Sequence, residues 1–554
     1  MKRVLLEAPM RNKNIINVAV IAHVDAGKST LVDALLAQSG VFKENEVQVE
    51  QVMDSNDLER ERGITIYSKN CAIEYKNTKI NVVDTPGHAD FSSEVERIMK
   101  TVDTVILLVD SSEGPMPQTR VVLQKSLEQG LRPILFINKI DKKDQRAEEV
   151  VDLSFDLFSE LGATDEQLDF PIIYGVAREG IAQLEMGANK TNLDDLFDLL
   201  LEHVTPYPDN SEEPLQMQVS TLGYDDYLGR LGTGRITRGT IKNGAIYKVS
   251  KRDGSIVPVK ISKLFVNEGL SKVEKQEAFA GDIITFAGIP HISIGETVCD
   301  VDNVEPMEMI DIEKPTLSMN FLVNDGPFVG RSGKLVTTRQ IRARLHKELE
   351  TNIGLEVAEL DGVEGYKVNG RGELHLSILL ENMRREGFEL CVSKPEVLYT
   401  EVDGQKYEPF EKAIISAPDE YVGSVIAQLN QKKGTMLFME SENGFTKMEY
   451  LVPTRGLIGY RSEFINTTHG QGSLEKVFFE YRPFAGTIDD RRNGVYIAKD
   501  KGIKLWQYLT LDRHLSHMQR EHWDILLLKL MWQMSRLTLP SMMHFSSITN
   551  VLIS

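Results

Sequence analysis

The sequence predicts a multidomain α/β protein that begins with a mostly parallel sheet. Three observations lead to this prediction: the chain length, an alternation of short apolar runs with helical stretches near the N-terminus, and a change of texture after residue 206. A chain of 554 residues is too long to fold around one hydrophobic core. We therefore expect an α/β domain with a phosphate loop, a β-barrel domain, two α+β domains of the ferredoxin-like kind, and a partial or aberrant C-terminal domain.

The alternation begins with residues 16–22 (INVAVIA), an apolar run that leads into a glycine-containing loop and a helical pattern. Three more apolar runs follow at residues 79–84, 104–110 and 133–138, with helical stretches between them. This order is typical of a parallel α/β sheet, in which ligands bind beyond the carboxyl ends of the strands. The runs end in polar motifs, so the spacing itself predicts a site at that edge.

The pattern of residue types changes near residues 206–210. Glycine-rich turns and short alternating segments then favour a β-barrel, and mixed strands and helices return after Pro315. Residues 338–352 and 374–387 have helical periodicity, and a second strand and helix mixture follows. The predicted domains are residues 1–205, 206–304, 305–395, 396–483 and 484–554.

Composition limits the class of protein. Hydrophobic residues make up 41% and charged residues 26%, which is ordinary for a soluble protein. No apolar run approaches the ~18 residues needed to span a bilayer, and the N-terminus lacks a signal-peptide core. The three cysteines, Cys71, Cys299 and Cys391, are far apart and suggest neither zinc nor disulfides. We expect a cytoplasmic protein with no membrane contact.

The net charge of −19 argues against broad binding to nucleic acid, but one local run is basic. Residues 331–347 contain six Lys or Arg and no acid. Two interpretations stay open: a surface that faces RNA, or one solvated helix face.

The first polar motif is AHVDAGKS at residues 22–29, with Ala22 where a phosphate loop usually has its first glycine. Successive backbone N–H groups at a helix N-terminus can cradle phosphates. Lys28 would reach the β and γ phosphates, and the Ser29 hydroxyl suits Mg²⁺. The predicted phosphate-binding residues are Asp25, Ala26, Gly27, Lys28, Ser29 and Thr30.

The second motif, DTPGH, closes the run at residues 79–84. Asp84 at a strand end suits Mg²⁺, and the Gly87 N–H can meet a γ-phosphate oxygen. A simple Pro-Gly turn is the alternative for this motif in isolation. Its place after a phosphate loop favours the functional interpretation.

The third motif, NKID, follows the fourth apolar run. The Asp141 carboxylate can accept hydrogen bonds from the N1–H and the 2-amino group of guanine. Adenine offers no such pair of donors, so the site would select GTP over ATP. The predicted guanine-binding residues are Asn138, Lys139, Asp141 and Ala177.

Residues 60–66 (RERGITI), taken with DTPGH and NKID in this order, resemble the translational GTPases, relatives of elongation factors Tu and G. The resemblance implies a P-loop GTPase domain in which Thr65 is a Mg²⁺ ligand with Ser29 and Asp84. It also implies a catalytic His88 that positions water, alongside Lys28 and Gly87. Val24 and Ile64 would form a hydrophobic gate.

A fifth family motif departs from the pattern. Where the family usually has Ser-Ala, this chain has Val176-Ala177. The Ala177 backbone could still meet the guanine carbonyl, but Val176 lacks the hydroxyl that steadies Asp141.

Downstream segments, among them RGELHLSILLENMRREG and PTRGLIGYRSEF, resemble the BipA or TypA family of ribosome-associated GTPases, from residue 13 to about 502. Elongation factor G would need a long inserted domain that this chain has no room for. The resemblance implies a monomer that binds ribosomal RNA near the factor-binding centre, in ribosome assembly and translation under stress. The predicted ribosome contacts are Arg331, Arg342, Arg344, Arg455 and Arg461.

The expected reaction is GTP + H₂O → GDP + phosphate with Mg²⁺ as cofactor, slow until the ribosome stimulates it. Three alternatives stay open. A LepA-like GTPase is opposed by the RGLIGYRSEF segment, and an ATP-dependent P-loop enzyme by Asn138 and Asp141. A nucleotide-locked RNA-binding module without productive hydrolysis is opposed by Thr65 and His88.

The composition changes abruptly after Gly502. Residues 503–554 contain none of the 41 glycines and all three tryptophans, and they carry a charge of +2 while the rest carries −21. Either the ending is genuinely divergent, or a shifted reading frame has replaced the family's C-terminal domain. We favour the second explanation, and expect residues 503–554 to pack poorly.

Overall fold

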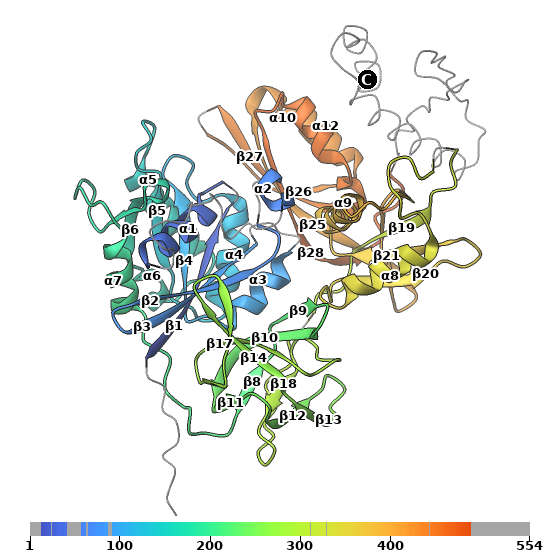
Figure 1. The fold of residues 1–554 in the computed structure, drawn as a ribbon. Coiled ribbons are helices and arrows are strands. Elements are labelled where there is room, and N and C mark those ends of the chain that lie inside the picture. The colour runs from blue at the N-terminus through green and yellow to red at the C-terminus, as the bar shows by residue number, and fades with distance from the viewer. Residues whose placement is uncertain are drawn as a thin grey trace, which may run out of the picture. The chain divides into compact units, whose positions relative to one another are not determined.

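The computed structural model describes residues 13–23, 25–40, 57–62, 65–86, 91–310, 312–327, 329–442 and 444–488 (Figure 1). They form two compact units. The first contains the residues up to 314 together with 348–354 and 475–477, and the second contains 315–347, 355–474 and the residues from 478. Among the described helices, none has the length and apolar character needed to cross a membrane. The predicted divergent segment from residue 503 lies outside the described residues.

The first unit begins with a seven-stranded sheet in the order β2-β3-β1-β4-β5-β6-β7. Neighbouring strands from β3 to β6 are parallel, whereas β2 and β7 are antiparallel edge strands. The strands are β1 (Asn14–Ala22), β2 (Lys69–Tyr75), β3 (Thr78–Asp84), β4 (Thr104–Asp110), β5 (Ile134–Asn138), β6 (Ile172–Val176) and β7 (Ile181–Gln183). The helices are α1 (Lys28–Gln38), α2 (Asp57–Arg62), α3 (Ser92–Met99), α4 (Pro117–Glu128), α5 (Ala147–Glu160), α6 (Asp165–Leu168), the 3₁₀ helix η2 (Ala177–Glu179) and α7 (Asp194–His203).

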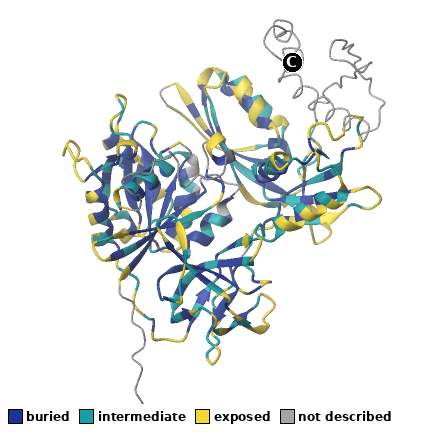
Figure 2. Cartoon of the chain, viewed as in Figure 1, coloured by how far each residue is buried: buried dark blue, intermediate teal, exposed yellow. Residues whose placement is uncertain are grey.

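The central strands are apolar throughout because both faces of the sheet are covered. In β1, Ile16, Val18 and Val20 face one core, which α1 and α7 complete. Ala19 and Ile21 face the other core, which α3, α4 and α5 complete. A strand buried on both faces reads as a continuous apolar run, and Figure 2 shows such buried residues along these strands. The prediction of a mostly parallel α/β domain is confirmed.

A β-barrel follows in the same unit. Its main sheet has the order β13-β12-β18-β8-β10-β17-β14-β15, with β9 paired to β10, and β11 pairs with β16. Its strands are β8 (Gln216–Gln218), β9 (Thr221–Asp225), β10 (Gly229–Arg238), β11 (Thr240–Lys242), β12 (Ile246–Ser250), β13 (Ile256–Lys260), β14 (Lys263–Glu268), β15 (Ser271–Glu274), β16 (Glu277–Phe279), β17 (Ile283–Ala287) and β18 (Thr297–Cys299). Alternate residues of these strands fill one apolar core. The predicted barrel is confirmed.

Buried polar contacts join the barrel to the parallel sheet. Asp282 accepts hydrogen bonds from Lys79 Nζ at 2.8 Å and from Asn81 Nδ2 at 3.1 Å. Asn17 Nδ2 donates to the Gly281 carbonyl at 2.9 Å, and Asn81 Nδ2 also donates to Asn17 Oδ1 at 2.8 Å. Because these groups are buried, each depends on its partner across the joint.

The second unit contains two domains of the same βαββαβ topology. The first comprises β19 (Leu317–Val323), α8 (Thr338–Leu349), β20 (Glu356–Glu359), β21 (Gly365–Gly370), α9 (Glu373–Arg385), β22 (Leu390–Val392) and β23 (Glu396–Val397). Its sheet has the order β20-β21-β19-β22, with β23 paired to β19. This arrangement is ferredoxin-like.

The next domain repeats the pattern. It comprises β24 (Thr400–Val402), β25 (Gln405–Pro418), α10 (Asp419–Gln431), β26 (Thr435–Glu442), β27 (Phe445–Pro453), α11 (Thr454–Leu457), α12 (Tyr460–Thr467) and β28 (Ser473–Pro483). Its sheet has the order β24-β25-β27-β26, with β28 also paired to β25. The prediction of two α+β domains is confirmed, whereas the exact domain boundaries remain predictions.

Candidate nucleotide-binding site

The predicted nucleotide-binding residues gather at the carboxyl edge of the parallel sheet. The phosphate loop follows β1, Asp84 ends β3, and Asn138 ends β5. Because parallel strands end at one edge, motifs separated by more than fifty residues lie next to each other.

The phosphate loop leads directly into α1. Gly27 is the residue before the helix, with φ +99°, and Ser29 and Thr30 are in the first helical turn. Their backbone N–H groups belong to the helix N-terminus, where anions are favoured. The side chain of Asp25 is exposed, whereas Ala26 is buried.

Lys28 is buried within this edge. Its Nζ lies 3.2 Å from Asp84 Oδ1 and also donates to the Thr85 carbonyl. Thr85 Oγ1 in turn donates to the Val20 carbonyl at 2.8 Å, which fastens the end of β3 to β1. The lysine charge is therefore held beside the carboxylate that was predicted to bind the metal.

Thr65 lies on the other side of Asp84. Its hydroxyl is 3.3 Å from Asp84 Oδ2, and both side chains are buried. The sequence motif placed these residues 19 positions apart, and the fold brings them together. A hydroxyl and a carboxylate are oxygen ligands that Mg²⁺ accepts. The sequence prediction adds the hydroxyl of Ser29, in the first turn of α1.

Within the part of the chain that the structure describes, no group of three or more His, Cys, Asp or Glu could hold a metal ion. A resident site built from protein ligands alone is therefore not found there. A hydroxyl and carboxylate set fits a metal that takes its remaining ligands from water and nucleotide phosphates.

Asn138 connects the base side of the edge to the phosphate loop. Its Nδ2 donates to the Ala26 carbonyl at 2.7 Å, and its Oδ1 accepts from the Ala177 backbone N–H at 2.9 Å. The N–H that was predicted to meet the guanine carbonyl is thus engaged by Asn138. Both side-chain groups of this buried amide are satisfied.

Lys139 has φ +62°, and its Nζ donates to the Asp25 carbonyl at 2.7 Å and pairs with Asp110 at 2.7 Å. Asp110 also binds Lys142 and Ser112. Burial alone would raise the pKa of Asp110, but hydrogen bonds from Lys139, Ser112 and Lys142 outweigh it and hold the pKa well below its usual range. Asp110 was not among the predicted site residues, although it ends one of the four apolar runs.

Asp141 is exposed two residues after Lys139. No other described residue forms a hydrogen bond or ion pair with its carboxylate. Val176 and Ala177 are both buried, so the position that lacks the family hydroxyl lies inside the protein. The arrangement leaves the Asp141 carboxylate available to a base.

His23, at the start of the phosphate loop, was not predicted to have a role. Its Nε2 lies 3.2 Å from Glu113 Oε2. Burial lowers the pKa of His23, and the neighbouring Glu113 carboxylate opposes this effect. The remaining predicted residues, Val24, Ile64, Gly87 and His88, lie outside the described residues.

The five predicted ribosome-contact arginines lie in the second unit and differ in exposure. Arg331 and Arg461 are exposed, and the Arg342 side chain is 58% exposed, 3.4 Å from Glu359. Arg344, in contrast, is 13% exposed and donates to both carboxylate oxygens of Glu386 on α9.

Arg455 is also turned inward. It pairs through two nitrogens with the fully buried Glu408 and donates to the Gly486 carbonyl. This arginine therefore holds the chain after β28 against its own domain.

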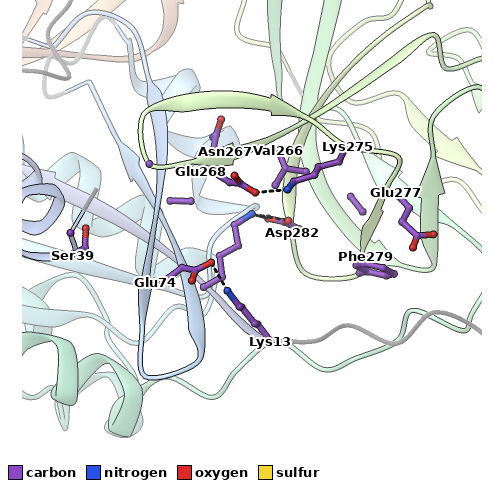
Figure 3. Close-up of a pocket in the computed structure, with 15 residues that line it drawn as sticks. Lys13, Ser39, Glu74, Val266, Asn267, Glu268, Lys275, Glu277, Phe279 and Asp282 are labelled. Carbon is purple, nitrogen blue, oxygen red and sulfur yellow. Dashed lines mark hydrogen bonds and ion pairs between the residues drawn. The ribbon is translucent and has the colours of Figure 1, made fainter. Parts of the chain in front are cut away.

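A separate cavity of about 530 Å³ lies at the joint between the β2–β3 hairpin and the barrel (Figure 3). Each lysine that lines it is paired with a carboxylate: Lys13 with Glu74, Lys79 with Asp282, and Lys275 with Glu268. None of the predicted nucleotide-binding residues lines this cavity. Its lining has three lysines and four carboxylates, so it offers no excess positive charge to an anionic ligand.

The fold and the site together define a GTPase of the translation-factor class. The parallel sheet carries a phosphate loop that enters α1 and an Asn-Lys-x-Asp loop that is hydrogen-bonded to it. A barrel and two ferredoxin-like domains follow. Family models agree: residues 13–206 match the elongation factor Tu GTP binding domain, residues 229–299 match elongation factor Tu domain 2, and residues 405–492 match the elongation factor G C-terminus. A crystal structure of a protein from Thermus thermophilus has a similar fold, with TM-score 0.58 and 17% identity over 85% of this chain and 97% of that chain.

Curated relatives identify the family within this class of GTPases. The chain is 51% identical over 488 residues to the large ribosomal subunit assembly factor BipA of Bacillus subtilis (strain 168), which covers 88% of this chain and 80% of the relative. It is also 51% identical to BipA of Synechocystis sp. over 88% of this chain and 82% of the relative, and 48% identical to BipA of Escherichia coli (strain K12) over 88% and 80%. The chain belongs to the BipA family, as its resemblance predicted.

Proposed function

We propose that this chain hydrolyses GTP to GDP and phosphate with Mg²⁺ as cofactor, that the ribosome stimulates the reaction, and that it acts in assembly of the large ribosomal subunit. One observation carries the hydrolytic part of the proposal. Lys28, Thr65 and Asp84 meet at the end of β3, beside the N-terminus of α1. A cation, a hydroxyl and a carboxylate at a phosphate-binding helix end are what phosphoryl transfer requires.

At the phosphate end, the backbone of residues 25–30 binds the phosphates and Lys28 neutralises charge on the β and γ groups. Ser29, Thr65 and Asp84 would hold the metal, which would supply positive charge that stabilises the transferred phosphoryl group. The Gly87 N–H and His88 orient the attacking water. Val24 and Ile64 are proposed as the hydrophobic gate for His88.

At the base end, Asn138, Lys139, Asp141 and Ala177 bind guanine, and the Ala177 N–H is then shared between the Asn138 amide oxygen and the base. The contacts of Asn138 with Ala26 and Ala177 support this role, because they fix the base loop relative to the phosphate loop. Lys139 does the same through the Asp25 carbonyl. The exposed Asp141 carboxylate then discriminates against adenine, which lacks the matching donors.

The ribosomal role is supported by the relatives, which are named for assembly of the large ribosomal subunit. An activity on ribosomes would place the protein in the cytoplasm. Its proposed partner is ribosomal RNA near the factor-binding centre. We propose that it is a monomer when free. We extend the proposal to translation under stress. The exposed arginines Arg331, Arg342 and Arg461 are better candidates for RNA contact than Arg344 and Arg455, whose side chains are only 13% and 15% exposed.

The proposed domain division remains 1–205, 206–304, 305–395, 396–483 and 484–554. Under this division the first domain contains every nucleotide-binding residue. The later domains then contribute ribosome contacts and place the first domain on its partner.

The test is release of phosphate from GTP, with and without ribosomes, for the wild-type protein and the His88→Ala variant. We expect ribosomes to raise the wild-type rate by several orders of magnitude, and excess ATP not to compete. His88→Ala should bind GTP normally and lose most of the stimulated rate. Ribosome binding without any stimulated hydrolysis in the wild-type protein would instead identify a nucleotide-locked RNA-binding module.

A further inference from the structure

Glu59 on α2 is fully buried and belongs to none of the predicted nucleotide-binding motifs. Its Oε1 accepts hydrogen bonds from the backbone N–H groups of Ile66 at 3.0 Å and Tyr67 at 3.1 Å. Its Oε2 pairs with Lys69 Nζ at 2.5 Å. A buried carboxylate is unfavourable without such donors, so these three contacts account for its position.

These contacts fasten the segment that carries Thr65. Thr65 directly precedes Ile66, and its hydroxyl lies 3.3 Å from Asp84 Oδ2. At the other end of the segment, Lys69 is the register partner of Asp84 across the β2–β3 pair. Glu59 therefore holds the backbone on the carboxyl side of Thr65 and the first residue of β2 at once.

We infer that Glu59 is a positioning residue for Thr65. Through contacts made by protein atoms alone, it sets the segment of residues 65–69 so that the Thr65 hydroxyl faces Asp84. This inference rests on the proposed function, in which Thr65 binds the metal of the GTP complex. A segment already held in place loses less conformational freedom when GTP binds, so Glu59 raises affinity for the triphosphate.

The expected effect of Glu59 on nucleotide affinity is specific to GTP. The Thr65 contact with the metal forms only with the γ-phosphate, so loss of Glu59 should leave GDP affinity unchanged. A merely structural carboxylate would instead stabilise the protein equally with either nucleotide. The two roles therefore differ in the ratio of GTP to GDP affinity.

The experiment measures affinity for GDP and for a GTP analogue with an imido bridge between the β and γ phosphates, at several Mg²⁺ concentrations. The proteins are wild type, Glu59→Gln, Thr65→Ala, the double variant and Glu61→Gln. Glu61 is exposed on the same helix, so its variant is a matched control for the loss of one charge.

We expect Glu59→Gln to lower the analogue affinity about tenfold, equivalent to ~1.4 kcal/mol, and to raise the Mg²⁺ requirement. GDP affinity should stay within about twofold, and the double variant should be no weaker than Thr65→Ala alone. Amide hydrogen exchange without nucleotide gives an independent measure. The N–H groups of Ile66 and Tyr67 should exchange slowly in the wild type and faster in Glu59→Gln.

Glu59→Asp provides a second variant, because it keeps the charge beside Lys69 but shortens the reach to the two N–H groups. If Glu59→Gln does not fold, Glu59→Asp serves in its place and should also lower affinity for the GTP analogue. Equal losses of GDP and analogue affinity, or a Glu59→Gln protein that matches Glu61→Gln, would overturn the inference while Thr65→Ala still weakens the analogue. A Thr65→Ala variant with wild-type affinity and Mg²⁺ requirement would overturn the metal role of Thr65 and the inference with it.

Discussion

Gly27→Ala tests whether Asn138 holds the phosphate loop in its binding conformation. A Cβ at residue 27 would lie 2.5 Å from Asn138 Nδ2, and φ at this position is +99°. The side chain of Asn138 must then move, which disrupts its hydrogen bonds to Ala26 and Ala177. Each is worth about 1 kcal/mol, so GTP and GDP affinity should fall by roughly 2 kcal/mol, or ~30-fold. Binding of a fluorescent guanine nucleotide measures the change.

Gly130→Ala is the matched control, because Gly130 also has positive φ (+73°) but an added Cβ meets nothing within 4 Å. Both variants should lose about 1 kcal/mol of unfolding free energy from left-handed backbone strain. Gly27→Ala should lose roughly 2 kcal/mol more with the two Asn138 hydrogen bonds, and only Gly27→Ala should lose affinity. Combining Gly27→Ala with Asn138→Ala should add little to the effect of Asn138→Ala alone. Wild-type affinity in Gly27→Ala, or fully additive losses in the double variant, would refute the reasoning.

Three further predictions concern the base, the ribosome and the domain joint. Asp141→Asn should lower the affinity for GTP by ~10²-fold or more and favour binding of xanthosine triphosphate. An unchanged preference for GTP in competition binding would exclude Asp141 from base recognition. Replacing the exposed Arg339 and Arg342 of α8 by Gln should reduce the slope of log affinity for the ribosome against log salt concentration by about one to two units. An unchanged slope would favour the other interpretation of residues 331–347, a solvated helix face. Asp282→Ala removes the partner of Lys79, whose side chain is only 13% exposed, and should reduce unfolding free energy by about 3 kcal/mol, measured by denaturant titration. Glu268→Ala, at an exposed ion pair of the same cavity, should cost less than about 1 kcal/mol.

The choice of arginines illustrates what a sequence pattern cannot distinguish. Residues 331–347 form one basic run in the sequence, but only some of their side chains are exposed to solvent. Ile341 and Leu345 face the interior of the domain, and Arg344 is paired with Glu386 from another helix. A variant that reverses Arg344 would break this ion pair and mix a folding defect with a binding defect. Arg339 and Arg342 are exposed, and the Glu359 partner of Arg342 is exposed as well, so neutralising them should cost little unfolding free energy.

The two ferredoxin-like domains show a similar limit. Residues 315–397 and 400–483 have the same strand order and the same alternation of helices, yet their sequences show only weak similarity to each other. Strand order follows from which apolar faces pair, and many sequences satisfy one pairing scheme. The sequence indicates mixed strands and helices, and the repeat becomes visible only in the fold.

The sequence by itself determined the class of this protein, because its three nucleotide motifs each lie at the end of an apolar run. Local spacing was sufficient there, since parallel strands place their carboxyl ends at one edge whatever lies between them. Only the tertiary structure decided the roles of Asp110 and Asp282. Asp110 binds lysines that are 29 and 32 residues away, and Asp282 meets strands 201 residues or more away. No period or local motif encodes such distances, because a buried charge acquires its partner only when separate elements pack together.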